Sequence, residues 1–527
     1  MPAGWAKALS VGLQGVQGHL VEIEVHIGAG LPRTVLVGLP DAALSEARDR
    51  CKAAVCNSNL PWPNRQLTVG LSPADLPKKG AHFDLGIALA VLAASEAVPV
   101  DAVAGVVVLG ELALDGRLRA VPGVLPAVLA AAERGIERVI VPESNADEAM
   151  LVIGVEVLGV RSLAQVVALL RGEPPPEAPP VPPLSAETRM LGCSERTRDL
   201  DMADVVGQPE ARRTLEAAAA GRHHVLLDGP PGAGKTMLAE RLPGLMPDLP
   251  HGEALEVTAV HSVAGVLPPG VPLITRPPLL DPHHSASTAS IVGGGSRVIR
   301  PGSMSLAHHG VLFLDEAPEF HRDVLEALRQ PLESGEIAIG RAERASRFPA
   351  RFLLVLAANP CPCGGLSGKA THCQCSPSAI RRYRDRISGP IRDRIDLQRT
   401  VRPVTARAMR ADLEHAEPTS VIASRVRDAV QRQQARLGAT PWTRNAEVPG
   451  PVLRRRFRPD PDALRVIEDA VSRGRLTARG ADRVVRVAWT LADLGGSDRP
   501  GIDEVGEAFL LRTSGALPGR VEIGAPS

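Results

Sequence analysis

One stretch of the sequence combines the residue types needed to hold a chain of phosphates. Residues 229–236 read Gly-Pro-Pro-Gly-Ala-Gly-Lys-Thr and fit the pattern G-x-x-x-x-G-K-[ST]. Glycines at these positions let backbone N–H groups wrap around phosphates, and the N-terminus of a following helix adds positive potential. In this pattern Lys235 reaches the β- and γ-phosphates, and the hydroxyl of Thr236 is a ligand for Mg²⁺. The residues predicted to bind ATP with Mg²⁺ are Gly229, Pro230, Pro231, Gly232, Ala233, Gly234, Lys235 and Thr236.

The residues around this stretch support the prediction. Val225–Leu227 is a short apolar run that suits a buried strand, and Met237–Glu240 suits the start of a helix. From residue 172 onward the only lysines are Lys235 and Lys369, although arginine is frequent. Lys235 therefore provides a compact ammonium group at a site where the broad guanidinium of arginine would fit less well. These features disfavour the alternative of a glycine-rich loop that arose by chance.

Two further strand ends carry the polar residues that hydrolysis of a bound triphosphate needs. Val311–Leu314 is an apolar run followed by Asp315 and Glu316. Such a strand would place Asp315 beside Mg²⁺ and Glu316 where it could activate the attacking water. A second apolar run, Leu353–Ala357, leads to Asn359, which could orient that water or contact the γ-phosphate.

These motifs together resemble those of AAA+ ATPases. Residues 203–208 (Ala-Asp-Val-Val-Gly-Gln) are similar to the start of the AAA+ core, and Asn359 takes the sensor-1 position. Residues 388–396 (Ser-Gly-Pro-Ile-Arg-Asp-Arg-Ile-Asp) resemble the arginine-finger element of the MCM and magnesium-chelatase branch. The resemblance implies that Arg394 reaches the γ-phosphate of a neighbouring subunit in a ring. Arg392 is a second candidate, because it stands where relatives usually carry an apolar residue.

Arginines also mark two predicted hairpins, around residues 287–303 and 336–352. In ring helicases of this branch, both hairpins project into the central channel and touch the nucleic-acid backbone. The alternative is that these are solvated arginines on ordinary hairpins. The predicted DNA contacts are Arg297, Arg300, Arg341 and Arg344.

Cysteine and histidine residues raise the question of metal binding. Of the seven cysteines, four form two Cys-x-Cys pairs, Cys361 with Cys363 and Cys373 with Cys375. Four thiolates within fifteen residues could close a tetrahedral Zn²⁺ site, although buried or free thiols are the alternative. The histidine pairs at 283–284 and 308–309 are predicted to have structural or nucleotide-relay roles rather than to bind metal.

The N-terminal part resembles the proteolytic domain of Lon-type proteases in Leu76–Val91 and Gly110–Glu143. In Lon the nucleophilic serine and its partner lysine lie in these two segments. The corresponding positions here hold His82 and Leu125, so the serine–lysine dyad cannot form. The resemblance therefore implies an inactive domain for assembly or nucleic-acid contact.

Composition sets the remaining bounds. The net charge is +1, but residues 376–458 hold nineteen arginines, no lysine and eight acidic residues, net +11. This segment could face nucleic acid, or it could reflect arginine-rich solvated helices. The odd number of cysteines and the absence of a signal-peptide pattern or an apolar run of 18 residues without charge favour a cytoplasmic protein without membrane spans.

The predicted fold class is a multidomain α/β protein. It comprises a Lon-protease-like α+β domain (1–171), a proline-rich linker (172–198), a P-loop AAA+ αβα core (199–400) and a helical lid (401–527). In the predicted lid, the segment Thr-x-Arg-Gly at 477–480 resembles a sensor-2 element. This resemblance assigns the nucleotide-closing arginine to Arg479, with Arg486 as the alternative.

The whole chain resembles the magnesium-chelatase-like AAA+ family of the ComM/YifB type. The best-matching stretches are GPPGAGKT, LAHHGVLFLDEAPEF, AANPCPCG, CQCSP and SGPIRDRIDL, while Ser303 replaces a glutamate usual in relatives. The resemblance implies a homohexameric ATPase stimulated by single-stranded or branched DNA. Family members act as branch-migration helicases on recombination intermediates in natural transformation. The rival hypotheses are a motor subunit for inserting Mg²⁺ into a porphyrin and a chaperone-like protein remodeller.

Overall fold

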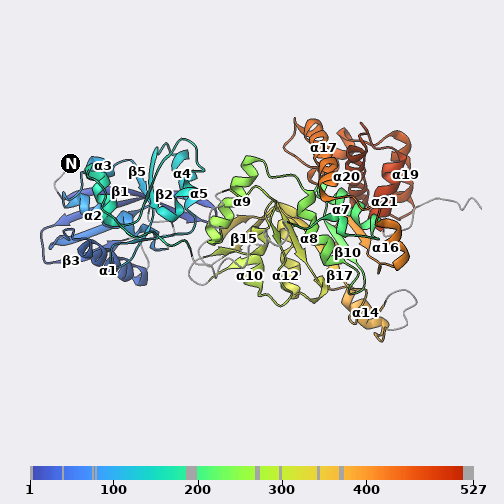
Figure 1. Ribbon diagram of the computed structural model, residues 1–527, viewed down its shortest axis with the longest axis horizontal. Coiled ribbons are helices and arrows are strands. Elements are labelled where there is room, and N and C mark those ends of the chain that lie inside the picture. The colour runs from blue at the N-terminus through green and yellow to red at the C-terminus, as the bar shows by residue number, and fades with distance from the viewer. Residues whose placement is uncertain are drawn as a thin grey trace, which may run out of the picture.

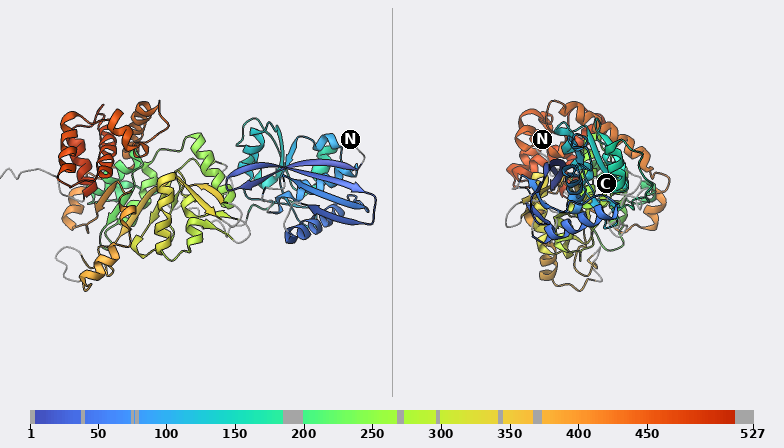
Figure 2. Two further views of the ribbon diagram at one scale, coloured as in Figure 1. Left: turned by 180° about the vertical axis from the view of Figure 1, so that it is seen from behind. Right: turned by 90° about the vertical axis from the view of Figure 1, so that its left-hand side faces the viewer.

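The computed structural model describes residues 4–37, 41–73, 76, 80–184, 199–267, 273–295, 299–340, 345–366 and 373–513. Its described parts follow one another along a long axis, with the N-terminal sheet at one end and a group of C-terminal helices at the other (Figure 1). The view from behind shows the same order (left panel of Figure 2), and in the end-on view the parts overlap along that axis (right panel). Among the described residues, no helix is long and apolar enough to cross a membrane.

Alternating residues build the N-terminal sheet. In β2, Val21, Ile23 and Val25 are buried, whereas Glu24 and His26 point to solvent. The mixed seven-stranded sheet has the order β3-β4-β2-β1-β5-β8-β9. Its strands are β1 (Trp5–Gln14), β2 (Gln17–Gly28), β3 (Arg33–Val37), β4 (Gln66–Ser72), β5 (Val106–Val108), β8 (Arg138–Pro142) and β9 (Glu156–Val160).

Helices cover this sheet, and a short ribbon of β6 (Glu111–Leu112) and β7 (Leu118–Arg119) lies beside it. Helix α2 is buried along its whole length, which fits its apolar sequence. The helices are α1 (Asp41–Asn57), α2 (Asp84–Ala94), α3 (Val100–Val103), α4 (Val124–Glu133), α5 (Ala146–Ala149) and α6 (Leu163–Arg171).

The first part of the proline-rich segment lies against the N-terminal domain. Gln165 and Arg161 donate side-chain hydrogen bonds to the carbonyl oxygens of Pro176 and Ala178, at 2.8 and 3.0 Å. Val181 is buried in the same apolar cluster as the sheet. Residues 173–183 thus form no helix or strand and are held at a few points, with most side chains exposed, and residues 185–198 of the predicted linker lie outside the described residues.

A five-stranded parallel sheet forms the centre of the molecule, in the order β11-β14-β17-β10-β18. Its apolar runs are buried on both faces, which is why they read as continuous rather than alternating patterns. The strands are β10 (Val225–Asp228), β11 (Leu279–Leu280), β14 (Val311–Leu314), β17 (Leu353–Ala358) and β18 (Leu397–Thr400).

Nine helices and two hairpins of the described residues surround this sheet. The hairpins are β12 (Gly293–Gly294) with β13 (Arg300–Pro301), and β15 (Glu336–Gly340) with β16 (Ala345–Pro349). The helices are α7 (Pro209–Gly221), α8 (Lys235–Leu245), α9 (His251–Ala264), α10 (Thr288–Val292), α11 (Ser303–Leu306), α12 (Arg322–Ala327), α13 (Arg329–Ser334), α14 (Pro377–Arg384) and α15 (Gly389–Arg392).

The C-terminal helices share an apolar core with the central sheet. Leu227 and Phe313 of the sheet belong to the same buried cluster as Val426 of α17 and Trp489 of α20. These helices therefore pack on the central sheet rather than forming a separate core. They are α16 (Ala406–Asp412), α17 (Thr419–Leu437), α18 (Gly450–Arg456), α19 (Pro461–Ser472), α20 (Ala478–Gly495) and α21 (Ile502–Thr513).

The N-terminal domain contacts the central part through α9. The hydroxyl of Ser262 donates to Glu148 Oε2 at 2.6 Å, and the N–H of Gly123 donates to the Ser262 carbonyl at 3.0 Å. At the tip of the β1–β2 hairpin, Gly15 approaches β16 so closely that a Cβ would lie 2.2 Å from the carbonyl oxygen of Arg347. The two parts are thus in direct contact at both places.

Candidate ATPase site

The phosphate-binding loop joins the end of β10 to the start of α8, the context its sequence predicted. Gly232 and Gly234 have φ values of 75° and 94°, a left-handed conformation that glycine adopts without steric cost. Gly229 lies against β18, where a Cβ would be 2.2 Å from the Val401 carbonyl oxygen. Conformation and close packing thus explain the glycines of the motif.

Three oxygens hold the ammonium group of Lys235 across the loop. Its Nζ lies 2.6 Å from the Gly229 carbonyl, 3.0 Å from the Pro230 carbonyl and 3.0 Å from Asn359 Oδ1. Burial lowers the pKa of Lys235, and the negative charge of Asp315 opposes this shift. The structure thus brings Asn359, at the tip of β17, to the lysine of the loop.

The proposed magnesium ligands also meet. Thr236 Oγ1 donates to Asp315 Oδ2 at 2.8 Å, which joins the start of α8 to the end of β14. Both are oxygen ligands of the kind that Mg²⁺ prefers. The residues present therefore fit the ion, together with the phosphates that it would accompany.

Glu316 has an unusual backbone. Its φ is 49°, in the left-handed region that non-glycine residues rarely adopt, and its N–H donates to Asp315 Oδ1 at 2.8 Å. Its half-exposed carboxylate is directed to His284, with Oε2 3.4 Å from Nδ1 of the imidazole. This histidine belongs to a pair that the sequence could assign only to a structural or nucleotide-relay role. Its partnership with Glu316 joins residues that are far apart in the chain, so no local pattern indicated it.

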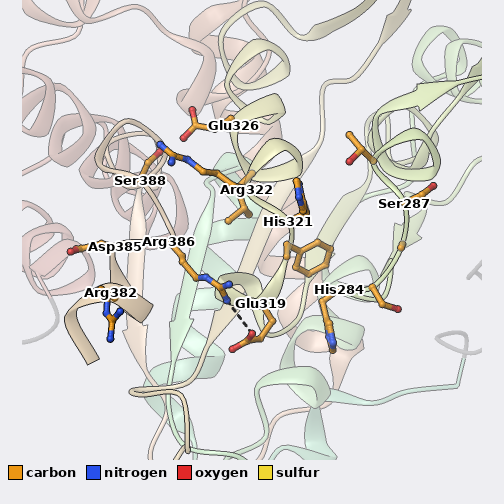
Figure 3. Close-up of a pocket in the computed structure, with 15 residues that line it drawn as sticks. His284, Ser287, Glu319, His321, Arg322, Glu326, Arg382, Asp385, Arg386 and Ser388 are labelled. Atoms are coloured by element: carbon orange, nitrogen blue, oxygen red, sulfur yellow. Dashed lines mark hydrogen bonds and ion pairs between the residues drawn. The ribbon is translucent and has the colours of Figure 1, made fainter. Parts of the chain in front are cut away.

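His284 also lines a pocket of about 910 Å³ beside the candidate site (Figure 3). The segment before α10, the start of α12 and the loop after α14 form its walls. Arginine and acidic side chains are part of these walls, and Arg386 donates to Glu319 at 3.1 Å (Figure 3). The pocket therefore combines charged side chains with apolar ones such as Phe320 and Leu325.

The predicted arginine finger lies in a cluster of positive charge. Arg394 forms an ion pair with Glu333 of α13, whose side chain is 62% exposed. Burial lowers the pKa of Arg394, and the charges of Arg483, Arg479 and Arg329 lower it further. Arg483 donates to the Arg394 carbonyl at 2.9 Å and pairs with Asp396, so it holds the finger segment in place.

The other arginines predicted for nucleotide contact have different surroundings. Arg479 is exposed and shares the environment of Arg394, and among the described residues no hydrogen bond joins it to the phosphate-binding loop. Arg486 is largely buried and donates to the Val448 carbonyl at 2.8 Å. Arg392 donates to the carbonyls of Ile387 and Arg384, so it braces its own turn.

The two predicted hairpins are present. Arg300 is exposed on β13, whereas Arg297, Arg341 and Arg344 lie outside the described residues. On β16, Arg347 is 73% exposed and lies 3.6 Å from Glu336 on the facing strand. Exposed arginine is therefore available on both hairpins.

The second histidine pair is held by structural hydrogen bonds. Nε2 of His308 and of His309 lie 2.9 and 3.1 Å from Glu256 Oε2, and His308 Nδ1 accepts from the N–H of Arg351 at 3.0 Å. On the other side of His309, Nδ1 faces Arg222 at 3.1 Å. Since both rings use both nitrogens, these contacts favour the structural role predicted from the sequence over metal binding.

In the N-terminal domain, the positions aligned with the Lon nucleophile and base carry no such chemistry. Leu125 is fully buried in α4, and its N–H donates to Glu148 at 3.3 Å. His82 lies on a short turn before α2, half-buried rather than at the surface, and burial lowers its pKa to about 4. Neither side chain is a nucleophile paired with a base.

Three family models match the chain in succession. "Subunit ChlI of Mg-chelatase" matches residues 23–145, "Magnesium chelatase, subunit ChlI" residues 201–409, and "Magnesium chelatase, subunit ChlI C-terminal" residues 416–512. The competence protein ComM of Haemophilus influenzae is 41% identical over 500 residues, covering 94% of this chain and 95% of ComM. The chain belongs to the magnesium-chelatase-like ComM/YifB family.

Two other relatives also match nearly the whole length of this chain. The protein YifB of Escherichia coli is 40% identical over 484 residues, which is 92% of each chain. An uncharacterized protein of Mycobacterium tuberculosis is 50% identical over 512 residues, covering 97% of this chain and 99% of that protein. Membership of this family implies an ATPase-type motor that uses ATP and Mg²⁺, in agreement with the geometry of the site.

Proposed function

We propose that the chain is an ATP-hydrolysing ring motor that moves along DNA, and that it drives branch migration of recombination intermediates during DNA uptake. The observation that carries the ATPase part is a single set of contacts. Lys235 touches Asn359, Thr236 touches Asp315, and Glu316 follows directly. In this proposal three separate segments of the chain supply a phosphate anchor, magnesium ligands, a water-orienting amide and a base.

Each side chain has a defined part in hydrolysis. The Lys235 ammonium moves from loop carbonyls to the β- and γ-phosphates when ATP occupies the loop. Mg²⁺ held by Thr236 and Asp315 would neutralise charge on the phosphate oxygens. Glu316 accepts a proton from a water molecule while the oxygen of that water attacks the γ-phosphorus. The bond between this phosphorus and the bridging oxygen of ADP then breaks. Asn359 donates to the attacking water or to the γ-phosphate.

The site is proposed to be completed by a neighbouring subunit in a homohexamer. Arg394 lies among Arg479, Arg483 and Arg329, and like charges so close together favour an added anion. Its partner Glu333 is exposed, so Arg394 can leave Glu333 and bind a γ-phosphate at little cost in free energy. In this arrangement Arg479 belongs to the surface presented to the neighbour rather than closing over its own nucleotide.

DNA as the track is supported by charge and by one relative's name. Arg300 and Arg347 are exposed on hairpins, and residues 376–458 carry a net charge of +11. ComM is named a competence protein. The name of the matching family models favours a second candidate, a motor for magnesium insertion into a porphyrin.

Hydrolysis should be measured with and without single-stranded and forked DNA over a range of salt. We expect stimulation that weakens as salt rises, because phosphate contacts release counterions. Lys235→Ala should abolish hydrolysis, and Glu316→Gln should bind ATP but trap it. Branch migration should then be followed on three- and four-way junctions. Hydrolysis that is indifferent to DNA, together with salt-insensitive DNA binding, would rule out the DNA motor and leave the chelatase and remodeller hypotheses.

A further inference from the structure

The two Cys-x-Cys pairs meet in space. Cys361 Sγ lies 3.4 Å from Cys363 Sγ and 3.6 Å from Cys373 Sγ, and Cys363 Sγ lies 3.8 Å from Cys373 Sγ. The fourth sulfur, of Cys375, belongs to the same group, in which all four sulfurs lie within 4.8 Å of one another. All four are free thiols, and their separations are well above the roughly 2.05 Å of a disulfide.

These separations match a tetrahedron of sulfurs around one ion. With Zn–S bonds of about 2.3 Å, the edges of such a tetrahedron are about 3.8 Å. Four thiol groups gain little from one another without a cation, because S–H is a weak donor and sulfur a weak acceptor. The N–H of Gly365 also donates to Cys363 Sγ at 3.4 Å, the kind of backbone contact that orients a metal-bound thiolate.

The cluster lies directly against the candidate ATPase site. Cys361 is two residues beyond Asn359, whose side chain accepts from Lys235 at 3.0 Å. Gly364 packs on the phosphate-binding loop, where a Cβ would lie 2.6 Å from Pro231 Cγ. A change in the conformation of the cysteine turn would therefore shift the phosphate-binding loop.

The cluster also joins this turn to α14. Cys375 immediately precedes Ser376, which caps α14 by accepting from the N–H of Ala379 at 3.2 Å. From the same helix, Arg384 donates to the Pro360 carbonyl at 3.3 Å. Helix α14 leads to the arginine-finger segment, so one ion would connect the end of β17, the phosphate-binding loop and the approach to Arg394.

We propose that Cys361, Cys363, Cys373 and Cys375 bind one structural Zn²⁺ per subunit, and that this ion braces the phosphate-binding loop through the contact of Gly364 with Pro231. The metal site stands independently of the proposed function, whereas the coupling to nucleotide rests on it. Four cysteine ligands leave no open coordination position, so the ion is structural rather than catalytic. Since binding couplings are reciprocal, bound nucleotide should raise the affinity for zinc by the same factor by which bound zinc raises the affinity for nucleotide.

The metal is tested first on the full-length protein purified under reducing conditions. Elemental analysis should find about one zinc per subunit, and replacement by Co²⁺ should give the intense visible bands of a tetrahedral thiolate site. Cys373→Ser should lose the metal, whereas the matched Cys56→Ser, at an exposed cysteine of α1, should keep it. Lys235→Ala should also keep it, which separates this test from hydrolysis. Protein that takes up no zinc and titrates four reactive thiols, or that forms disulfides among them, would overturn the site.

The coupling is tested by comparing zinc-loaded and zinc-depleted protein, with Mg²⁺ held constant. We expect ATP-analogue affinity to fall at least about fivefold on depletion, and zinc affinity to rise by the same factor when the analogue is bound. Equal nucleotide affinity in the two forms would overturn the coupling while leaving the metal site intact. Absence of DNA stimulation would count only against the DNA motor.

Discussion

At the scale of single residues, Glu316 shows what a sequence motif leaves open. An apolar run ending in two carboxylates predicted a magnesium ligand followed by a base, and the structure places Asp315 on Thr236 as that hypothesis requires. It could not predict the left-handed backbone of Glu316 or the approach of His284, because both depend on how β14 meets a distant segment. A non-glycine residue in this conformation is an observed outlier that points to a functional role.

We predict that His284 positions Glu316 for catalysis. Its Nδ1 lies 3.4 Å from the Glu316 carboxylate, so His284→Ala should leave that carboxylate free to rotate. We expect kcat to fall about tenfold, or about 1.4 kcal/mol, with little change in KM. His284→Gln should recover part of the rate because its amide can donate to the same oxygen. His251→Ala, at an exposed histidine on α9, is the matched control, and a change in KM alone would contradict this role.

A second prediction concerns Asp84, which is buried at the start of α2. Burial raises the pKa of Asp84 to about 6, although Arg50 at 2.8 Å opposes the shift. Between about pH 4 and 6 the folded state retains a proton on Asp84 that the unfolded chain loses near pH 4. The stabilisation that comes from the protonated Asp84 is therefore complete below about pH 4 and is lost as the pH rises to about 6. The shift corresponds to about 3 kcal/mol, and Asp84→Asn should remove this pH dependence.

Hydrogen exchange of α2 at matched pH values measures the Asp84 effect. The opening free energy of the wild type relative to Asp84→Asn should fall between pH 4 and 6. Exchange in α20 serves as the internal control, since that helix belongs to a different apolar cluster. A difference that stays constant or grows over this range would show that Asp84 is not held protonated.

At the scale of elements, long apolar or amphipathic runs were predictable and their surroundings were not. Residues 85–94 form an apolar run and residues 422–437 an amphipathic run, and these lie in α2 and α17; both hairpins form where arginine marked them. Strands β1 and β4, which both pair with β2, were not predicted, although Leu67, Val69 and Leu71 alternate with more exposed residues along β4 as a half-buried strand requires. Similarly, the proline-rich composition of residues 172–184 did not reveal that Val181 is buried against the N-terminal domain.

The hairpin of β12 and β13 gives the prediction at this scale. Arg300 is exposed on β13, so its guanidinium is free to reach a DNA phosphate. Arg300→Ala should weaken DNA binding on all sequences alike and reduce the slope of log K against log salt by about 1. Arg473→Ala, on an exposed helix end at an arginine paired with Asp469, should leave the slope unchanged. Loss of affinity without a change of slope would show that Arg300 supports the hairpin rather than contacting phosphate.

At the scale of the whole molecule, the candidate site has two groups of residues, which we propose come together between subunits. Lys235, Asn359 and Asp315 gather at the carboxyl edge of the sheet, whereas Arg394 lies with Arg479 and is braced by Arg483 from the C-terminal helices. The resemblance of residues 388–396 to an arginine-finger element is the reason to propose that a neighbouring subunit supplies Arg394. An active site assembled between subunits makes a prediction that one assembled within a subunit does not.

Two inactive variants should therefore restore activity to each other. Lys235→Ala removes the phosphate anchor but keeps the finger, and Arg394→Ala does the reverse; each alone should hydrolyse ATP at least about 1000-fold more slowly. In rings assembled from an equal mixture, about a quarter of the interfaces pair an intact loop with an intact finger, so up to about a quarter of the wild-type rate should return. Mixing Arg394→Ala with the double variant Lys235→Ala/Arg394→Ala is the control and should restore nothing. If the first mixture instead hydrolyses ATP only at the mean rate of its two component variants, Arg394 acts within its own subunit or does not act on the nucleotide. In that case the positive cluster around it must bind another anion.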